Sequence, residues 1–170
     1  MCVISACVSE RITPDQVAKQ FAENPHGAGI AWREWTDKKG GLIEMPLDLV
    51  EARKVASKAA NKGVVWKKGL SLEAVQELVA KVPLPFVVYF RVPSCGGPSE
   101  FLTHPFPITA GIELELEGST PSQVLFHNGH WTEWKRRVED TAAKGQGKIP
   151  TGKWSDSRAL AWMAYNMGAG

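Results

Sequence analysis

The sequence has few cysteines, no long apolar run and no excess of charge of one sign, and each absence excludes a class of protein. Its cysteines, Cys2, Cys7 and Cys95, are odd in number and lack paired spacing, which argues against a disulfide framework or a structural zinc site. The longest apolar run, at residues 85–90, is far shorter than the roughly 20 residues that span a bilayer. We therefore predict a protein of the reducing cytoplasm, with no leader sequence, membrane anchor, metal or cofactor.

Basic and acidic residues nearly balance. The chain carries 20 Lys and Arg against 18 Asp and Glu, well mixed along the sequence. Such a mixture gives no broad field that would attract nucleic acid or a membrane surface. One local stretch, residues 131–137, is both basic and aromatic, and we interpret it as a solvated helix face beside core tryptophans rather than a nucleic-acid-binding patch. The predicted partner is a small molecule, without nucleic acid or membrane.

What is present is the composition of one ordinary globular domain. The chain has 170 residues, 44% of them hydrophobic and 22% charged. A chain of this length buries most of the surface that its unfolded form exposes, so a single core is the default expectation. We predict one domain over residues 1–170.

Hydrophobic alternation predicts several short strands. Along residues 2–8, both sets of alternating side chains are mainly apolar, which indicates a strand covered on both sides. Residues 111–117 alternate between isoleucine or leucine and glutamate, which predicts a half-exposed strand whose acidic face meets solvent rather than a metal. A further strand is predicted to follow the glycine-rich start of residues 26–32, and a turn at 37–41 leads to a returning strand at 42–43. Extended segments are also predicted at 85–91, 105–108 and 123–129.

Helical spacing and N-cap residues predict four helices. These begin after Thr13, near residue 47, after Ser71 and after Ser155, the first ending at Asn24. The second and third cover residues 47–60 and 70–82, so they are expected to follow one another directly. An exposed loop is expected at residues 142–153.

Polar and glycine-rich residues collect at the predicted strand ends and at the start of the last helix. Strand ends and helix N-termini expose backbone donors and side chains to ligands, so a site built from several of them is expected. Taken separately, each has a structural interpretation: Asn128 and Gly129 as a hairpin turn, Asp156 as a helix cap, and Cys2 as a small buried residue. The segments concerned are 26–29, 91–97, 103–105, 127–129 and 155–157.

The order of these motifs resembles the class II glutamine amidotransferase domain, a member of the N-terminal nucleophile hydrolases. The resemblance covers nearly the whole chain, and the combination of an early cysteine, His-Pro-Phe and His-Asn-Gly is more specific than any single piece. It implies an α+β fold with four layers, α/β/β/α, in which two antiparallel sheets pack face to face between helices. The matching segments are MC at 1–2, NPHGAGIAW at 24–32, FRVPSCGG at 90–97, THPFPI at 103–108, LFHNGHW at 125–131 and SDSRALA at 155–161.

The resemblance also implies a nucleophile. Removal of Met1 would leave Cys2 with a free α-amine, whose ordinary pKa of about 8 suits it to take the proton of its own thiol. By resemblance, Cys2 attacks the side-chain amide of glutamine and forms a thioester, with release of ammonia and then glutamate. Asn128 and Gly129 would supply the oxyanion hole.

Substrate-binding roles follow from the same resemblance. Arg91 would match the carboxylate of the amino acid and Asp156 its ammonium. Ser94, Thr103 and His104 would complete and shape the pocket.

Several uses of such a domain stay open at this point. The domain could supply ammonia to a synthase partner in trans, hydrolyse glutamine or another γ-glutamyl or small amide by itself, or keep the fold as a non-catalytic binding module. Domains of the family continue past the last helix with further strands, so the resemblance indicates either a C-terminally shortened or a compact domain.

Overall fold

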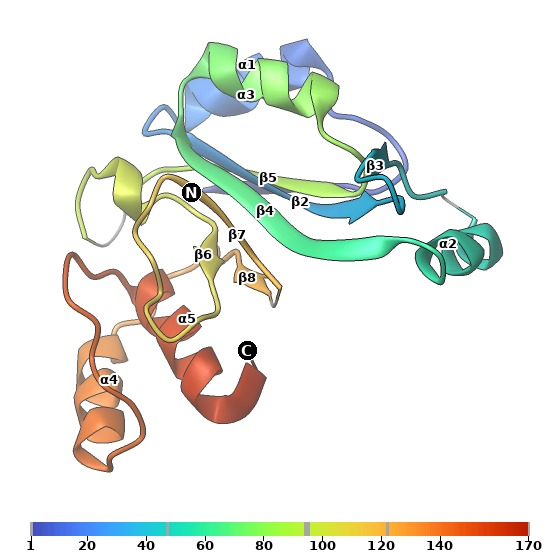
Figure 1. The fold of residues 1–170 in the computed structure, drawn as a ribbon. Helices are drawn as coiled ribbons and strands as arrows, with labels where there is room; N and C mark the ends of the chain where they lie inside the picture. The colour runs from blue at the N-terminus through green and yellow to red at the C-terminus, as the bar shows by residue number, and fades with distance from the viewer. Residues whose placement is uncertain (1, 47, 94–95, 122, 170) are drawn as a thin grey trace.

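The computed structural model describes residues 2–46, 48–93, 96–121 and 123–169. It is an α+β fold in which a large antiparallel sheet has two helices on one side and a small sheet with further helices on the other (Figure 1). All strand pairs given for these residues are antiparallel, which confirms the predicted fold at this coarse level. In the part of the chain described, no helix has both the length and the apolar character needed to cross a membrane.

The large sheet has six strands. Its main path runs β1-β5-β2-β4-β7, and the short β3 pairs with β2. The strand bounds are β1 Val3–Cys7, β2 Ala28–Thr36, β3 Leu42–Ile43, β4 Ala60–Leu70, β5 Phe86–Phe90 and β7 Glu117–Thr120.

Helices α1 (Pro14–Glu23) and α3 (Leu72–Lys81) cover one face of this sheet. Both begin where the sequence predicts, because Thr13 forms a capping box with Gln16 and the Ser71 hydroxyl accepts from the N–H of Ala74. The buried core between helices and sheet is almost wholly apolar. Its members include Cys7, Val17, Ala28, Ile30, Val75, Val79, Phe86, Val88 and Phe90.

The small sheet and α5 cover part of the opposite face. Strands β6 (Phe106–Pro107) and β8 (Val124–Leu125) form the small sheet, which contacts α5 (Asp156–Ala164). One cluster joins the two sheets through Ala31, Val64 and Trp66 against Val124 and Phe126. A second joins β6 to α4 (Trp134–Ala143) and α5 through Leu102, Phe106, Ile112, Val138, Ala159, Ala161 and Trp162.

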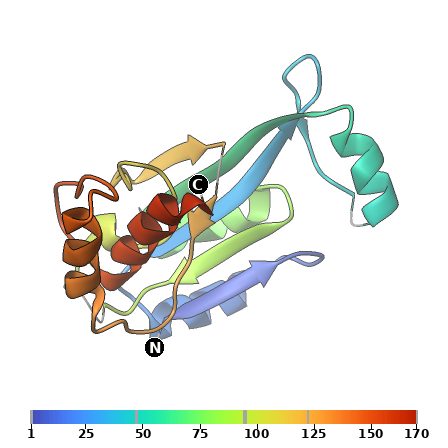
Figure 2. The ribbon, with the colours of Figure 1, turned by 90° about the horizontal axis from the view of Figure 1, so that it is seen from below.

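The prediction that the first strand is buried on both faces is wrong. β1 lies at the edge of the large sheet, and Ile4 and Val8 on its outer face are 38% and 61% exposed. Figure 2 looks at this face and shows that β8 and α5 cover only part of it and leave β1 uncovered. An apolar strand pattern therefore did not require a second layer here.

Both helices predicted at 47–60 and 70–82 are present, as α2 and α3, but the prediction that they follow one another directly is wrong. Helix α2 covers only Leu49–Ala56, and the eleven residues from Ala60 to Leu70 form β4, which pairs with β2 and with β7. Its centre, Val64 to Trp66, has the β-branched and aromatic residues that strands favour. The lysines, glycines and asparagine around that centre hide the pattern.

Residues 111–116 are not a strand, contrary to the alternation of glutamate with isoleucine and leucine. Ile112 has a φ of +44°, which breaks the extended conformation. The carbonyl of Ile112 accepts from Arg158 Nε at 3.2 Å, and that of Leu116 accepts from the Lys68 N–H at 2.7 Å. β7 starts only at Glu117.

The remaining elements differ from prediction mainly in length. The strand expected at 123–129 is the short β8, and the last helix continues from α5 as a π-helical turn at Tyr165–Ala169. A 3-10 turn, η1, covers Glu100–Leu102. On α4, Arg136 and Arg137 face solvent and pair with Glu133.

Candidate functional site

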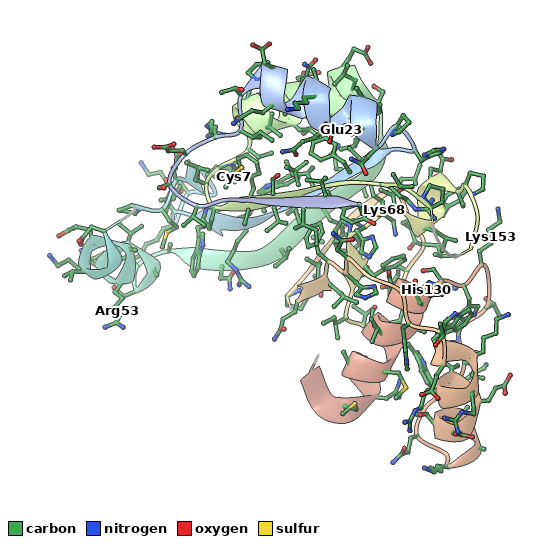
Figure 3. The ribbon with its side chains drawn as sticks, turned by 180° about the vertical axis from the view of Figure 1, so that it is seen from behind. Cys7, Glu23, Arg53, Lys68, His130 and Lys153 are labelled. Carbon is green, nitrogen blue, oxygen red and sulfur yellow. The ribbon has the colours of Figure 1, made fainter. Side chains whose placement is uncertain are left out.

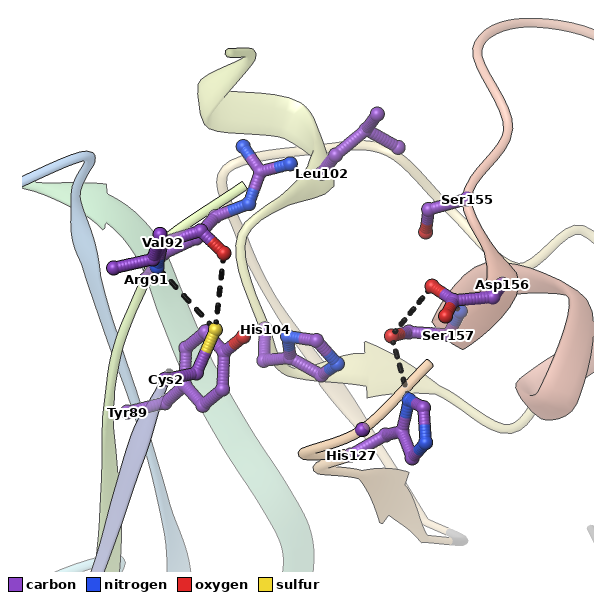
Figure 4. Close-up of a pocket in the computed structure, with 11 residues that line it drawn as sticks. Cys2, Tyr89, Arg91, Val92, Leu102, His104, His127, Ser155, Asp156 and Ser157 are labelled. Carbon is purple, nitrogen blue, oxygen red and sulfur yellow. Dashed lines mark hydrogen bonds between the residues drawn. The ribbon is translucent and has the colours of Figure 1, made fainter. Parts of the chain in front are cut away.

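A polar pocket opens where β5, the His-Asn-Gly bend and the start of α5 meet (Figure 4). Its empty volume is about 300 Å³, which includes the open mouth. The lining residues are Cys2, Tyr89, Arg91, Val92, Leu102, His104, His127, Gly129, Ser155, Asp156 and Ser157.

Cys2 enters the pocket because of strand alternation. Successive side chains along an extended chain point to opposite faces, so Cys2 and Cys7 leave the strand on opposite sides. Cys7 lies in the helix-side core, as Figure 3 shows, whereas Cys2 lines the pocket. The Cys2 thiol donates to the carbonyl of Val92 at 3.1 Å and accepts from its N–H at 3.3 Å. These contacts fix the sulfur beside the end of β5.

The His-Asn-Gly bend is held against both Cys2 and α5. Asn128 Nδ2 donates to the Cys2 carbonyl at 2.7 Å, and Gly129 lines the pocket. His127 Nδ1 lies 3.0 Å from Ser157 Oγ at the start of α5. Residues more than 120 positions apart in the chain thus meet at one point.

Arg91 follows β5 directly and is 4% exposed. Its Nη1 donates to the carbonyl of Ser99 at 2.7 Å and its Nη2 to that of Gly97 at 2.9 Å. The guanidinium therefore holds the loop after β5 close to the pocket and adds a positive charge to its wall.

Asp156 is the first residue of α5 and is 3% exposed. Its carboxylate accepts from the N–H of Trp131 at 3.0 Å and from that of Ser157 at 2.8 Å, and His130 Nδ1 lies at 3.6 Å. A helix N-terminus favours a negative charge. The pocket thus has an anion at one side and the Arg91 cation at another.

Two buried rings next to Cys2 have shifted pKa values. Burial, with the hydrogen bond to Cys2, raises the pKa of Tyr89 well above its ordinary value. Burial, followed by the positive charges of His127, Arg91 and Lys68, lowers the pKa of His104 well below its ordinary value. Both rings are therefore neutral at physiological pH.

The structure brings most of the predicted site residues together, but not all. Thr103 is not among the lining residues. Its buried Oγ1 lies beside Gly27, at 3.4 Å from the position that a Cβ atom on that glycine would take. Ser94 lies outside the described residues. Asn128 reaches Cys2 from the rim. Those that line the pocket are Cys2, Arg91, His104, Gly129 and Asp156.

Tyr89 lines the pocket but lies outside the segments expected at the site, whereas His127 and Ser157 line it from the expected segments 127–129 and 155–157, where neither was given a role. Alternation along β5 could have found Tyr89, since it shares a face with Arg91. The 26–29 segment, expected in the composite site, instead contributes His26 and Gly27 to a separate hollow beside Ser99. Among the described residues, no group of three or more His, Cys, Asp or Glu side chains is arranged to hold a metal ion.

A scan against protein-family models and a search of curated proteins found no match to the chain. The geometry of the pocket is therefore the structural basis on which a function can be proposed.

Proposed function

We propose that this chain is an N-terminal-cysteine amidohydrolase, similar to the class II glutamine amidotransferase domain, that hydrolyses the side-chain amide of glutamine. One observation carries the proposal: the Cys2 sulfur shares a polar pocket with Gly129 of the His-Asn-Gly bend, with Arg91 and with Asp156. The resemblance gives these residues complementary roles in one reaction.

The chemistry requires removal of Met1. The free α-amine of Cys2 then takes the thiol proton, and the thiolate attacks the amide carbon of glutamine. The new carbon–sulfur bond leaves a negative charge on the amide oxygen, which the Gly129 N–H and the Asn128 side chain stabilise. Collapse breaks the carbon–nitrogen bond, and ammonia leaves with the proton held by the α-amine. Water then hydrolyses the thioester, giving glutamate and the free thiol.

The position of Asn128 supports this assignment. Its side-chain amide is already within hydrogen-bond distance of the Cys2 backbone, at 2.7 Å. His127 and Ser157, 3.0 Å apart, link the same bend to α5. An oxyanion hole acts through donors that are placed before the charge develops, and this bend is held on two sides.

The charges around the pocket suit a free amino acid. Asp156 is a buried carboxylate that accepts from two backbone N–H groups and, at 3.5 Å, from the Ser157 hydroxyl, with the exposed His130 at 3.6 Å. None of these described partners is a lysine or an arginine, so the anion is suited to an ammonium group. Arg91 provides the positive charge for the substrate carboxylate.

The layers of the fold are compatible with the same proposal. Helices α1 and α3, the large sheet, the small sheet and α5 succeed one another in the order of an α/β/β/α sandwich. We propose that this is a compact form of the N-terminal nucleophile hydrolase fold, in which the second sheet is reduced to β6 and β8.

The test begins with protein whose loss of Met1 is verified by intact mass. A glutamine analogue with a diazoketone in place of the amide should add one label, located at Cys2 by peptide mass, and the protein should release ammonia from glutamine. Cys2→Ala should take no label at that position, whereas Cys7→Ala, whose thiol is buried on the other side of the sheet, should label like the wild type.

The outcomes separate the alternatives. Ammonia released by the chain alone indicates a free-standing hydrolase, and release only with an added synthase indicates an amidotransferase half. Processed protein that takes no label and hydrolyses no γ-amide would exclude the amidohydrolase and leave the binding-module interpretation.

A further inference from the structure

His104 is the most unusual polar side chain of the pocket. It is 3% exposed, and neither Nδ1 nor Nε2 has a hydrogen-bond partner among the described residues. A buried polar atom without a hydrogen-bond partner destabilises the fold, so native structures keep few of them without a reason. Figure 4 shows the ring in the wall of the pocket between Cys2 and Ser157. The missing partner is therefore expected from the pocket itself.

The ring is held firmly by aromatic neighbours. Its centroid lies 4.2 Å from that of Tyr89, 5.1 Å from Phe106 and 6.5 Å from Phe126. Tyr89 and Cys2 both line the pocket, and the proximity of Cys2 contributes to the raised pKa of Tyr89. These ring contacts fix the orientation of the imidazole, and Tyr89 lies next to both the imidazole and Cys2.

A neutral imidazole offers one N–H donor and one lone pair. Burial and the surrounding cations keep His104 in this neutral form, so it does not carry a charge that would attract a carboxylate. His104 lines a pocket whose empty volume is about 300 Å³ with the open mouth included, so a hydrogen-bond donor placed in the pocket can reach the acceptor nitrogen. The NH₂ of a primary carboxamide is such a donor.

We infer that His104 determines specificity for a primary carboxamide, by accepting a hydrogen bond from the NH₂ of the reacting amide. This rests on the proposed function and names the substrate class of the same site. An ester or a carboxylate presents oxygen lone pairs to the lone pair of the ring, and a secondary amide replaces one N–H donor of the primary amide by a methyl group. Sites built to hydrogen-bond a substrate reject analogues that leave the buried group unpaired.

The experiment compares kcat/KM for glutamine, for the γ-methyl ester of glutamate and for γ-glutamyl methylamide. His104→Phe keeps an aromatic ring and removes both nitrogens, so the amide-to-ester ratio should fall about 10- to 100-fold, with the loss on the amide. His104→Gln, which keeps an acceptor, should restore part of the ratio. Phe126→Leu alters the same stack without a polar atom and should leave the ratio within threefold.

A second measurement does not depend on turnover or on variants of His104. In Cys2→Ala protein, the dissociation constants of glutamine and glutamate should differ at least tenfold in favour of glutamine. A preference below threefold, or an amide-to-ester ratio that His104→Phe leaves unchanged, overturns the inference and makes His104 a stacking residue of the core.

Failure of the inference is distinguishable from failure of the proposed function. If the wild type hydrolyses amide and ester and takes the Cys2 label while His104→Phe keeps the ratio, only the role of His104 is wrong. If the wild type hydrolyses neither and takes no label, the amidohydrolase proposal fails and the inference fails with it.

Discussion

The two faces of the large sheet bury different kinds of side chain. The face under α1 and α3 buries an apolar cluster that includes Ile30, Val88 and Phe90. On the opposite side the structure buries ionisable groups, namely Lys68, Arg91, His104, Asp156 and Arg158. Burial of apolar surface stabilises a fold, whereas buried charged and polar groups rarely do so on their own account. The helix face therefore supports the fold, and the other face holds the polar pocket of the proposed function.

The two described cysteines give the sharpest test of this comparison, and the largest expected effect. Cys2→Ala should lower amide hydrolysis at least about 1,000-fold, because the nucleophile is lost, and should change the free energy of unfolding by under about 0.5 kcal/mol. Cys7→Ala should do the opposite: it removes a buried sulfur from the helix-side core, which costs about 1 kcal/mol, and leaves turnover unchanged. Ammonia release and urea unfolding measure both quantities. Loss of activity in Cys7→Ala with its fold intact would contradict the separation of the two faces.

The next largest effect is expected at the bend. Asn128→Ala removes a proposed oxyanion donor and should lower kcat about 100- to 1,000-fold, with less effect on KM. Asn166→Ala is the matched control, since Asn166 Nδ2 also donates to a backbone carbonyl, that of Trp162 at 2.8 Å, but far from the pocket. Steady-state ammonia release checks both variants. Equal losses in the two would show that the effect of Asn128 is structural.

The helix face could be predicted from the sequence because local rules govern it. Thr13 and Ser71 cap their helices as expected, and the apolar stretch at 85–90 contains β5, an interior strand between β1 and β2. Each of these signals lies within a dozen neighbouring residues. Packing of the helices on the strands then follows from amphipathic spacing.

The other face could be predicted only in part, because distant segments build it. The position of Cys2 beside Asn128 and Asp156 followed from the resemblance and not from periodicity. Residues 111–116 broke the alternation rule, since Arg158 and Lys68 bind the carbonyls of Ile112 and Leu116 from other elements. Tertiary contacts of this kind leave no periodic signal along the chain.

Two isoleucines, one on each face of the large sheet, test how much each face contributes to stability. Ile30 is fully buried on the helix face, so Ile30→Ala should lower the free energy of unfolding by about 2–5 kcal/mol. Ile4 lies on the uncovered face of the edge strand and is 38% exposed, so Ile4→Ala should cost under about 1 kcal/mol. Urea denaturation measures both. Equal costs would mean that the outer face of β1 is covered in solution.

The smallest expected effect concerns Lys68, the buried amine of the polar side. It is 2% exposed, its Nζ lies 4.8 Å from the centre of the Phe106 ring, and its hydrogen bond to the Glu113 carbonyl is long, at 3.5 Å. Burial, followed by the charge of Arg158, lowers the pKa of Lys68 from 10.5 to about 8. Below pH 8 both folded and unfolded chains carry the proton, and the cost of burying the charge is fully present. Between pH 8 and 10.5 the folded chain has lost the proton and the unfolded chain keeps it.

Stability should therefore rise with pH in that window, by at most about 1.4 kcal/mol per pH unit. Lys68→Met keeps the apolar stem over Phe106 and removes the titrating amine, so its free energy of unfolding should lack this rise. Tyr89, whose pKa is raised, opposes the trend only above about pH 10 and is present in both proteins. Urea unfolding at pH 7, 8, 9 and 10 gives the difference between the two proteins. If the difference in free energy of unfolding between wild type and Lys68→Met does not change with pH, the Lys68 amine is hydrated in solution. The polar side of the sheet would then be more open to water than the helix side.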